Sequence, residues 1–243
     1  MLERPQNKGD WNLTLLRDLI YDGLLATKIR LAELNCKTPT DYFRMIQRIK
    51  VSSGIRSLSM TQKENEIVPL LDHAARKTIR AACEIGTGRG GTTYLLAKVV
   101  QPKATLITVD LTNNWRNALL LRSLAGARRK LHVISGDSKS PSTFQRIAGL
   151  LNNQSLDLLF IDGDHSRIGV ESDFQLYSKL VQRGGWIVLH DIIFDHRTRF
   201  GVETEACSGD VPVFWNQIKN RYSHYEIVED YQQDGFGIGV IEV

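Results

Sequence analysis

Glycines and acidic side chains that suit nucleotide binding follow apolar runs in the middle of the sequence. The segment Cys83–Gly91 reads CEIGTGRGG, and Gly86, Gly88 and Gly91 match the G-x-G-x-x-G spacing of dinucleotide-binding loops. Glycines let the backbone turn sharply and approach a ligand closely at the positive end of the next helix. Asp110 ends the next apolar run, where a carboxylate can bind ribose hydroxyls. The spacing leaves a nicotinamide dinucleotide and another nucleoside cofactor open.

Further carboxylates at the ends of neighbouring runs favour a ligand that carries positive charge. Glu84 precedes the glycine loop, where it suits a cationic cofactor and would repel a pyrophosphate. Asp137 follows a third run and could accept a hydrogen bond from the exocyclic amine of an adenine. A fourth run ends in Asp162-Gly163-Asp164-His165. Because open α/β sheets bind ligands at the carboxyl ends of their strands, we expect these acids to surround one cleft.

A mostly parallel sheet with helices on both faces would position these groups. Runs that are apolar throughout alternate with helical segments, which is typical of a buried parallel sheet. The expected strands are Ala81–Ile85, Thr105–Val109, Leu131–Ile134, Leu156–Ile161, Trp186–Leu189, Tyr225–Val228 and Gly237–Glu242. The expected helices are Thr92–Val100, Asn117–Ala127, Ser142–Leu151, Gly169–Val181 and Val211–Arg221. The last two strands have no helix between them and predict an antiparallel hairpin. The fold class is therefore α/β, with a Rossmann-like, doubly wound, seven-stranded sheet and an N-terminal helical cap.

The cap is predicted to take residues 1–60, and the sheet domain residues 61–243. Apolar side chains recur at helical spacing at Leu13, Leu15, Leu16, Leu19, Ile20, Leu24 and Leu25. Thr38-Pro39-Thr40-Asp41 predicts the start of a second helix. Residues 51–63 are polar and predict a linker, and residues 64–77 a helix. The leucine stripe can pack on its own domain or on a partner subunit, so a homo-oligomer stays open.

Composition excludes several classes of protein. Of the 243 residues, 42% are hydrophobic and 24% charged, which excludes a disordered tail. No run approaches the roughly 18 apolar residues of a membrane helix, and no signal peptide is recognised. The three distant cysteines suit a reducing, cytoplasmic location. The basic cluster between Arg116 and Lys130 predicts a solvated helix face, so a net charge of +4 does not favour a nucleic-acid partner.

Five segments resemble the class I S-adenosylmethionine-dependent methyltransferases, within the branch described as cephalosporin hydroxylase-like or rhamnosyl O-methylase-like. They are EIGTGRGG (Glu84–Gly91), TVD (Thr108–Asp110), SGDS (Ser135–Ser138), GFGIGVIEV (Gly235–Val243) and, most specific, the block Leu156–Ile192. The resemblance covers about residues 60 to 243. It implies transfer of a methyl group from S-adenosylmethionine to a small-molecule acceptor, with a hydroxyl of a sugar or secondary metabolite as the favoured site.

The resemblance also implies which residues contact the cofactor. Glu84 would support its methionine end, Asp110 its ribose and Asp137 its adenine amine. Arg89 is unusual beside a cationic ligand, and it would point outward or pair with the cofactor carboxylate. The full set of expected contacts is Glu84, Gly86, Thr87, Gly88, Asp110, Leu111, Asp137, Ser138 and Asp162.

Three residues are candidate metal ligands: Asp162, His190 and Asp191. Related O-methyltransferases hold magnesium at the matching positions, and two carboxylates suit that hard cation. Histidine is a poor magnesium ligand, so manganese, zinc or iron would suit the set as well. The alternative is that the two carboxylates shape the pocket and bind no metal.

Asp162, Asp164 and His165 are the candidate catalytic residues. A histidine titrates near neutrality, so His165 can take the proton of an acceptor hydroxyl. Asp164 would orient His165 or act as the base itself. A loop histidine that only shapes the turn is the alternative. Asp173 is expected to be structural, and the loop Ile192–Asp210 is long enough to act as a lid.

Two other functions remain open at this point. An NAD(P)-dependent oxidoreductase shares the glycine loop and Asp110, but it leaves Glu84 and Asp137 without a role. A non-catalytic protein that binds S-adenosylmethionine would share the fold, because a fold alone does not guarantee activity. The acids at four strand ends argue against the second, since an inactive site has no need of them.

Overall fold

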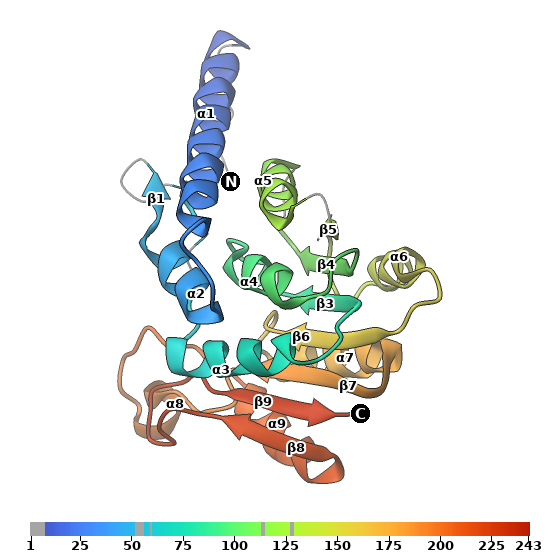
Figure 1. Ribbon diagram of the computed structural model, residues 1–243. Helices are drawn as coiled ribbons and strands as arrows, with labels where there is room; N and C mark the ends of the chain where they lie inside the picture. Colours follow the sequence, from blue (N-terminus) through green and yellow to red (C-terminus); the bar gives the residue numbers. More distant parts are fainter. Residues whose placement is uncertain (1–7, 52–55, 59, 113–114, 127–128) are drawn as a thin grey trace.

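A seven-stranded sheet forms the centre of the protein (Figure 1). The computed structural model describes residues 8–51, 56–58, 60–112, 115–126 and 129–243. The strand order is β5-β4-β3-β6-β7-β9-β8, and β3 to β7 are parallel, while β9 runs antiparallel to both β7 and β8. The bounds are β3 Ala81–Ile85, β4 Thr105–Asp110, β5 Lys130–Ser135, β6 Leu156–Ile161, β7 Val181–His190, β8 Ser223–Ile227 and β9 Ile238–Glu242. The predicted sheet and its antiparallel C-terminal hairpin are confirmed.

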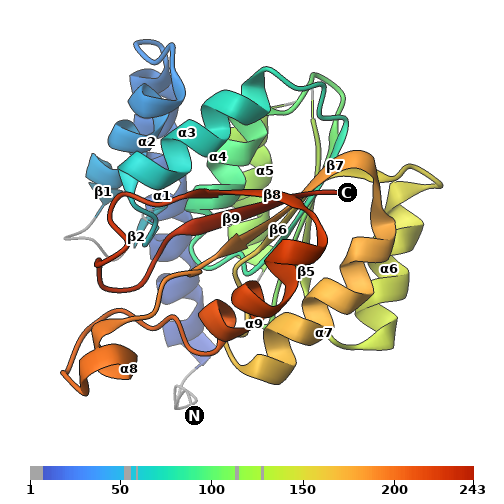
Figure 2. The ribbon, with the colours of Figure 1, turned by 90° about the horizontal axis from the view of Figure 1, so that it is seen from below.

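Helices cover both faces of this sheet (Figure 2). Alternate residues of a strand point to opposite faces, so Ala82 of β3 belongs to one buried cluster and Cys83 to another. The first cluster includes side chains of α1 to α5, and the second includes side chains of α6, α7 and α9. The bounds are α1 Lys8–Glu33, α2 Pro39–Arg48, α3 Glu64–Ala75, α4 Gly91–Val99, α5 Trp115–Ala125, α6 Pro141–Leu151, α7 Arg167–Tyr177, α8 His196–Phe200 and α9 Val211–Ile218.

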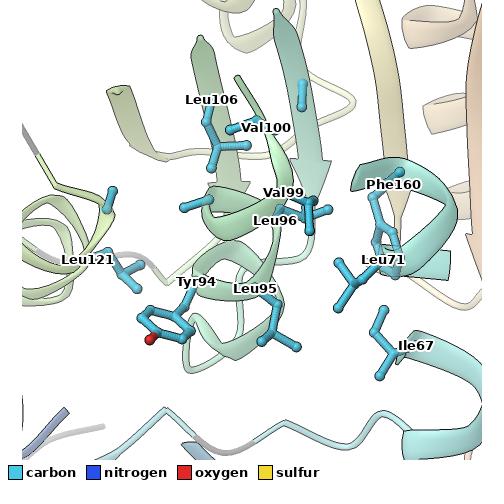
Figure 3. Close-up of a cluster of buried hydrophobic side chains, with 14 of the residues drawn as sticks. Ile67, Leu71, Tyr94, Leu95, Leu96, Val99, Val100, Leu106, Leu121 and Phe160 are labelled. Carbon is cyan, nitrogen blue, oxygen red and sulfur yellow. The ribbon is translucent and has the colours of Figure 1, made fainter. Parts of the chain in front are cut away.

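The N-terminal cap shares the first cluster with the sheet. Leu25 and Ile29 of α1 and Phe43 of α2 are buried there, together with the side chains of α3 and α4 drawn in Figure 3. An ion pair joins Glu33 to Lys98 of α4 at 2.6 Å. The division of the chain at residue 60 stays a prediction. None of the described helices has the length and apolar character needed to cross a bilayer.

Element boundaries differ from the prediction most clearly in three places. The predicted helix ending at Val181 stops earlier, because Val181 pairs with Leu156 and begins β7. The predicted linker, residues 51–63, overlaps a small hairpin of β1 (Lys50–Val51) and β2 (Arg56–Ser57). The predicted lid loop contains α8. Short elements of this kind form through contacts with the rest of the chain rather than through a local pattern.

The start of α2 agrees with its sequence signal. The side chain of Thr38 accepts a hydrogen bond from the Asp41 amide, and that of Asp41 accepts one from the Thr38 amide, which makes a capping box.

The leucine stripe of α1 does not pack inward as a whole. Leu25 is buried, but the other described members of the stripe are between 40% and 56% exposed. The side chain of Leu13, like Ala127 at the end of a predicted helix, lies outside the described part of the chain.

Candidate active site

A cavity of about 810 Å³ opens at the carboxyl ends of β3, β4, β5 and β6. Ligands bind at this edge of an open α/β sheet. Most residues predicted to contact a cofactor line it together, namely Gly86, Thr87, Gly88, Asp110, Leu111, Asp137, Ser138 and Asp162. Met60, Thr61 and Gln62, which lie between β2 and α3, contribute to the same wall. The volume is in the range of pockets that hold small organic ligands, about 300–1,000 Å³.

The glycine loop approaches the cavity in a conformation that requires glycine. Gly86 has a φ of +96°, and a Cβ at this position would overlap the carbonyl oxygen of Asp162. Gly88 has a φ of +51°, and a Cβ there would meet nothing within 4 Å. Its amide donates a hydrogen bond of 2.9 Å to Asp110 Oδ2, which fixes the loop against the end of β4. The loop therefore leaves open space for a ligand above Gly88.

Glu84 is the one predicted cofactor residue that is absent from the described cavity wall. It is fully buried behind the glycine loop, where Oε2 accepts hydrogen bonds from the hydroxyls of Thr93 and Thr108. Its Oε1 has no hydrogen-bond partner among the described residues. Burial raises the pKa of this carboxyl to about 8, although the two threonines oppose the shift. Glu84 thus ties β3, β4 and α4 together beneath the loop.

Local hydrogen bonds hold the adenine and ribose candidates in place. Asp110 Oδ1 accepts a hydrogen bond of 3.0 Å from the Thr112 amide. Asp137 Oδ1 accepts one of 2.9 Å from the Lys139 amide, and the Tyr177 hydroxyl of α7 donates to the Ser138 carbonyl at 2.8 Å. Short turns of this kind present a carboxylate in a defined direction. The two carboxylates therefore stand at fixed positions in the wall.

Two aspartates and two histidines form a cluster beside this cavity. His165 Nε2 lies 3.5 Å from both Asp162 Oδ1 and Asp191 Oδ2. His190 Nδ1 lies 3.2 Å from the same oxygen of Asp162 and 3.0 Å from the same oxygen of Asp191. Asp191 has a φ of +63°, a strained value for a residue other than glycine, and Oδ1 accepts a hydrogen bond from the Phe236 amide. Strain of this kind is frequent at functional sites.

The charges of the cluster shift the pKa values of its members. Asp162 is buried, but the two histidines outweigh burial and lower the pKa of its carboxyl. The hydrogen bond to Asp162 and the charge of Asp191 raise the pKa of His165 to about 9, against the effect of burial. Burial also opposes the charge on His190, yet the two aspartates raise its pKa well above the usual value. Opposite charges within about 4–6 Å have this effect.

The same side chains meet the chemical requirements of a divalent-cation site. Asp162, His165 and Asp191 each offer one ligand atom, and these atoms lie within 4.8 Å of one another. His190 Nε2 is buried and has no hydrogen-bond partner in the described structure. A ligand set of two carboxylates and one imidazole suits manganese, zinc or iron better than magnesium, which prefers oxygen ligands alone. The predicted pair Asp162 and Asp191 is thus brought together, with both histidines in reach.

Asp164 does not join this cluster. Its Oδ2 forms an ion pair of 2.6 Å with Lys139, and its Oδ1 accepts a hydrogen bond from the Ser166 amide. Lys139 and Ser166 lower the pKa of this carboxyl to about 2. His165 Nδ1 instead lies 2.6 Å from the Cys207 carbonyl oxygen. Because a carbonyl can only accept, Nδ1 carries the proton, and Nε2 is the nitrogen that faces the carboxylates.

Gln62 is a cavity residue that sequence reasoning missed. Its Nε2 donates a hydrogen bond of 2.8 Å to Asp162 Oδ2, so it contacts the acid cluster from the cap side. Its buried Oε1 has no partner among the residues the structure describes. The residue lies in the segment predicted to be a linker, where no spacing or motif marks it. Only the packing of that segment across the cavity reveals its position.

Comparisons with known proteins agree with this geometry. Residues 83–192 match the protein family described as "Methyltransferase domain". The uncharacterized protein R132 of Acanthamoeba polyphaga mimivirus is 56% identical over 114 residues, which cover 44% of this chain and 49% of that protein. The aligned part of the chain thus spans about half the length of this curated relative.

Solved structures share the fold at low sequence identity. The O-methyltransferase TomG from Streptomyces achromogenes, solved with SAM, is 17% identical at a TM-score of 0.55, over 89% of this chain and 96% of that one. An O-methyltransferase from Bacillus cereus, solved with SAH, is 17% identical at a TM-score of 0.58, over 90% of this chain and 100% of that one. Residues 83–192 therefore resemble a methyltransferase domain, and the chain shares the Rossmann-like fold of these solved structures.

Proposed function

We propose that the protein transfers a methyl group from S-adenosylmethionine to a hydroxyl of a small molecule, a sugar or a secondary metabolite. The observation that carries this proposal is the single cavity wall that joins the glycine loop, Asp110 and Asp137 to Asp162 and His165. The glycine loop, Asp110 and Asp137 suit a nucleoside that carries a sulfonium. Asp162 and His165 can receive a proton from an acceptor. Structurally similar O-methyltransferases solved with SAM or SAH support the same cofactor.

Most of the catalysis in such a site comes from positioning. The acceptor oxygen attacks the methyl carbon in line with the sulfur, the carbon–sulfur bond breaks, and S-adenosylhomocysteine leaves. The acceptor hydroxyl loses its proton, and we assign His165 Nε2 as the receiving atom because the Cys207 carbonyl holds the opposite nitrogen. Asp162 links the two halves, since it lines the cavity and contacts both His165 and Gln62.

A divalent cation is the second component of this proposal. Asp162 and Asp191 would hold it together with one of the two histidines. We assign that role to His190, which leaves His165 as the base. When bound, such an ion would polarise the acceptor hydroxyl and favour loss of its proton. The two carboxylates otherwise keep His165 protonated at neutral pH, because its pKa is raised to about 9. A cation bound beside His165 would lower the pKa of that imidazole and so allow it to act as a base nearer to pH 7.

Calorimetric titration with S-adenosylhomocysteine tests the cofactor, with NADH as the control ligand. We expect S-adenosylhomocysteine to bind and NADH not to bind. Asp110→Ala should weaken binding by roughly 10- to 100-fold, because a hydrogen bond to a charged group contributes about 1.5–3 kcal/mol. Binding of NADH alone would instead support the oxidoreductase.

A transfer assay with hydroxyl-bearing sugars and phenolic metabolites then tests the reaction. Transfer that depends on His165 would support the proposal. Binding without transfer to any acceptor would favour the non-catalytic protein. A cytoplasmic location belongs to the same proposal and rests on the three widely spaced cysteines.

A further inference from the structure

Helix α1 carries an apolar face that the described part of its own protomer leaves uncovered. Leu25 and Ile29 point into the core, whereas Leu15, Leu16, Leu19, Ile20 and Leu24 are between 40% and 56% exposed. Figure 1 shows that α1 extends beyond the layers around the sheet. A helix that is apolar on both sides is normally buried on both sides. The exposed side therefore calls for a partner.

The exposed face of α1 is symmetric about the point midway between Leu19 and Ile20. An α-helix turns by about 100° per residue, so residues whose numbers sum to 39 lie at equal angles on either side of one line. Leu19 and Ile20 form the central pair, and Leu15 and Leu24 form the outer pair. Leu16 and Gly23 both lie near the midline, one on each side of the centre. A face with this symmetry can pair with a copy of itself around a two-fold axis.

Leu16 and Gly23 make the face complementary in shape as well. A Cβ built on Gly23 would meet nothing within 4 Å, so this part of the helix is bare backbone facing open space. In an antiparallel pair, each Leu16 lies opposite the Gly23 of the other helix, and a large side chain fills the place of a missing one. Small residues allow helices to approach closely in this way.

Charge also permits this pairing. The face between Leu15 and Leu24 carries no charged side chain along its midline, so two copies do not repel each other. Arg17 lies on the flank and pairs with Asp18 of its own helix at 3.6 Å. A partner of strongly acidic or basic character would find no complementary charge there. We propose that α1 mediates an antiparallel homodimer, in which Leu16 of each protomer packs on Gly23 of the other.

The size of the face predicts a weak dimer. The ten residues from Leu15 to Leu24 extend over about 15 Å, and a helix with its side chains is about 10 Å wide. The paired helices thus cover a few hundred Å² per protomer at most, which is below the roughly 800 Å² of a standard interface. We expect a reversible dimer whose population rises with concentration across the range of roughly 1 to 100 µM.

Sedimentation velocity over this concentration range tests the dimer, with Gly23→Leu as the main variant. The substitution fills open space within the protomer and replaces a poor helix former, so the fold should be kept. In the dimer it would collide with Leu16, and we expect at least a tenfold weaker association. The double variant Leu16→Ala/Gly23→Leu should regain much of the affinity, because the register pairs these two positions. Ile168→Glu on α7, an apolar residue that is 76% exposed, is the matched control and should not change association.

Disulfide trapping tests the antiparallel direction. In a background with Cys36→Ser and Cys207→Ser, protein with Leu16→Cys is mixed with protein with Gly23→Cys under oxidation. Antiparallel pairing brings the two positions together and predicts a mixed disulfide, whereas each variant alone should cross-link poorly. A wild-type protein that stays monomeric throughout, or a dimer that Gly23→Leu leaves unchanged, would overturn the proposal. Cross-links that form only between identical variants would overturn the antiparallel arrangement.

Discussion

Replacing Asp173 by asparagine should stabilise the protein at neutral pH and have a much smaller effect in acid. Asp173 lies on α7 and is fully buried. Burial raises the pKa of this carboxyl from 3.8 to about 6, while the Ser138 hydroxyl and Lys139 partly oppose the shift. The charged form is therefore disfavoured in the folded protein.

The shift sets the size and the sign of the effect. A raised pKa means that the folded protein binds this proton more tightly than the unfolded chain does. The contribution to stability is complete below pH 3.8 and is lost as the pH rises through about 6. Two pKa units at about 1.4 kcal/mol each give a loss of about 3 kcal/mol at most. Asparagine does not titrate, so its variant escapes this loss. For a chain of this length, 3 kcal/mol corresponds to a difference in Tm of roughly 6–12 °C.

Thermal unfolding of the wild type and Asp173→Asn between about pH 4 and pH 8 tests this reasoning. The difference in Tm should grow in favour of the variant as the pH rises. Any constant cost of burying the amide cancels in that comparison. Glu205→Gln, which removes an exposed carboxyl, is the control and should give a difference that hardly changes with pH. A Tm difference between the wild type and Asp173→Asn that is the same at every pH would refute the idea that Asp173 is a destabilising buried acid.

Three further predictions concern the cavity. Gly86→Ala should abolish S-adenosylhomocysteine binding and destabilise the fold by about 1–3 kcal/mol, because the new Cβ overlaps a backbone carbonyl and φ is positive. Gly149→Ala is the control, since a Cβ at that position meets nothing within 4 Å. Normal binding by Gly86→Ala in calorimetry would contradict the geometry. His165→Gln should lower turnover by roughly 10²- to 10⁴-fold in a methyl-transfer assay with little change in cofactor affinity, whereas full turnover would leave this histidine a purely structural role. Treatment with a strong chelator should lower activity and remove a metal detectable by elemental analysis, and Asp191→Ala should have the same two effects. An active protein free of metal would show that the carboxylates work without one.

Much of the sheet domain could be predicted because its signals are local. Runs that are apolar throughout indicate the buried strands, and the glycine loop with Asp110 and Asp137 indicates the edge of the sheet where the cavity opens. Strand ends were less well predicted at β7, whose first residue Val181 pairs with Leu156 across the sheet. That pairing depends on a neighbour distant in the sequence, so no local pattern could indicate it.

The partners of individual side chains depended on the tertiary structure. Asp164 and His165 are adjacent in the sequence, yet one pairs with Lys139 and the other with the Cys207 carbonyl. Gln62 reaches Asp162 across a separation of 100 residues. Hydrogen bonds and ion pairs act over a few ångströms, and which groups come within that distance is set by loops that carry no periodic signal.

The α/β architecture, the edge of the sheet where the cavity opens and the acids that line it therefore follow from the amino-acid sequence alone. Burial periodicity and glycine loops are properties of neighbouring residues, so they can be recognised without knowing how the rest of the chain folds. The packed structure was needed to show that Glu84 lies behind the loop, that both histidines face the same two carboxylate oxygens and that Leu15, Leu16, Leu19 and Leu24 of α1 are exposed while Leu25 is buried. These features depend on how distant segments pack together, and packing is settled by the whole chain at once.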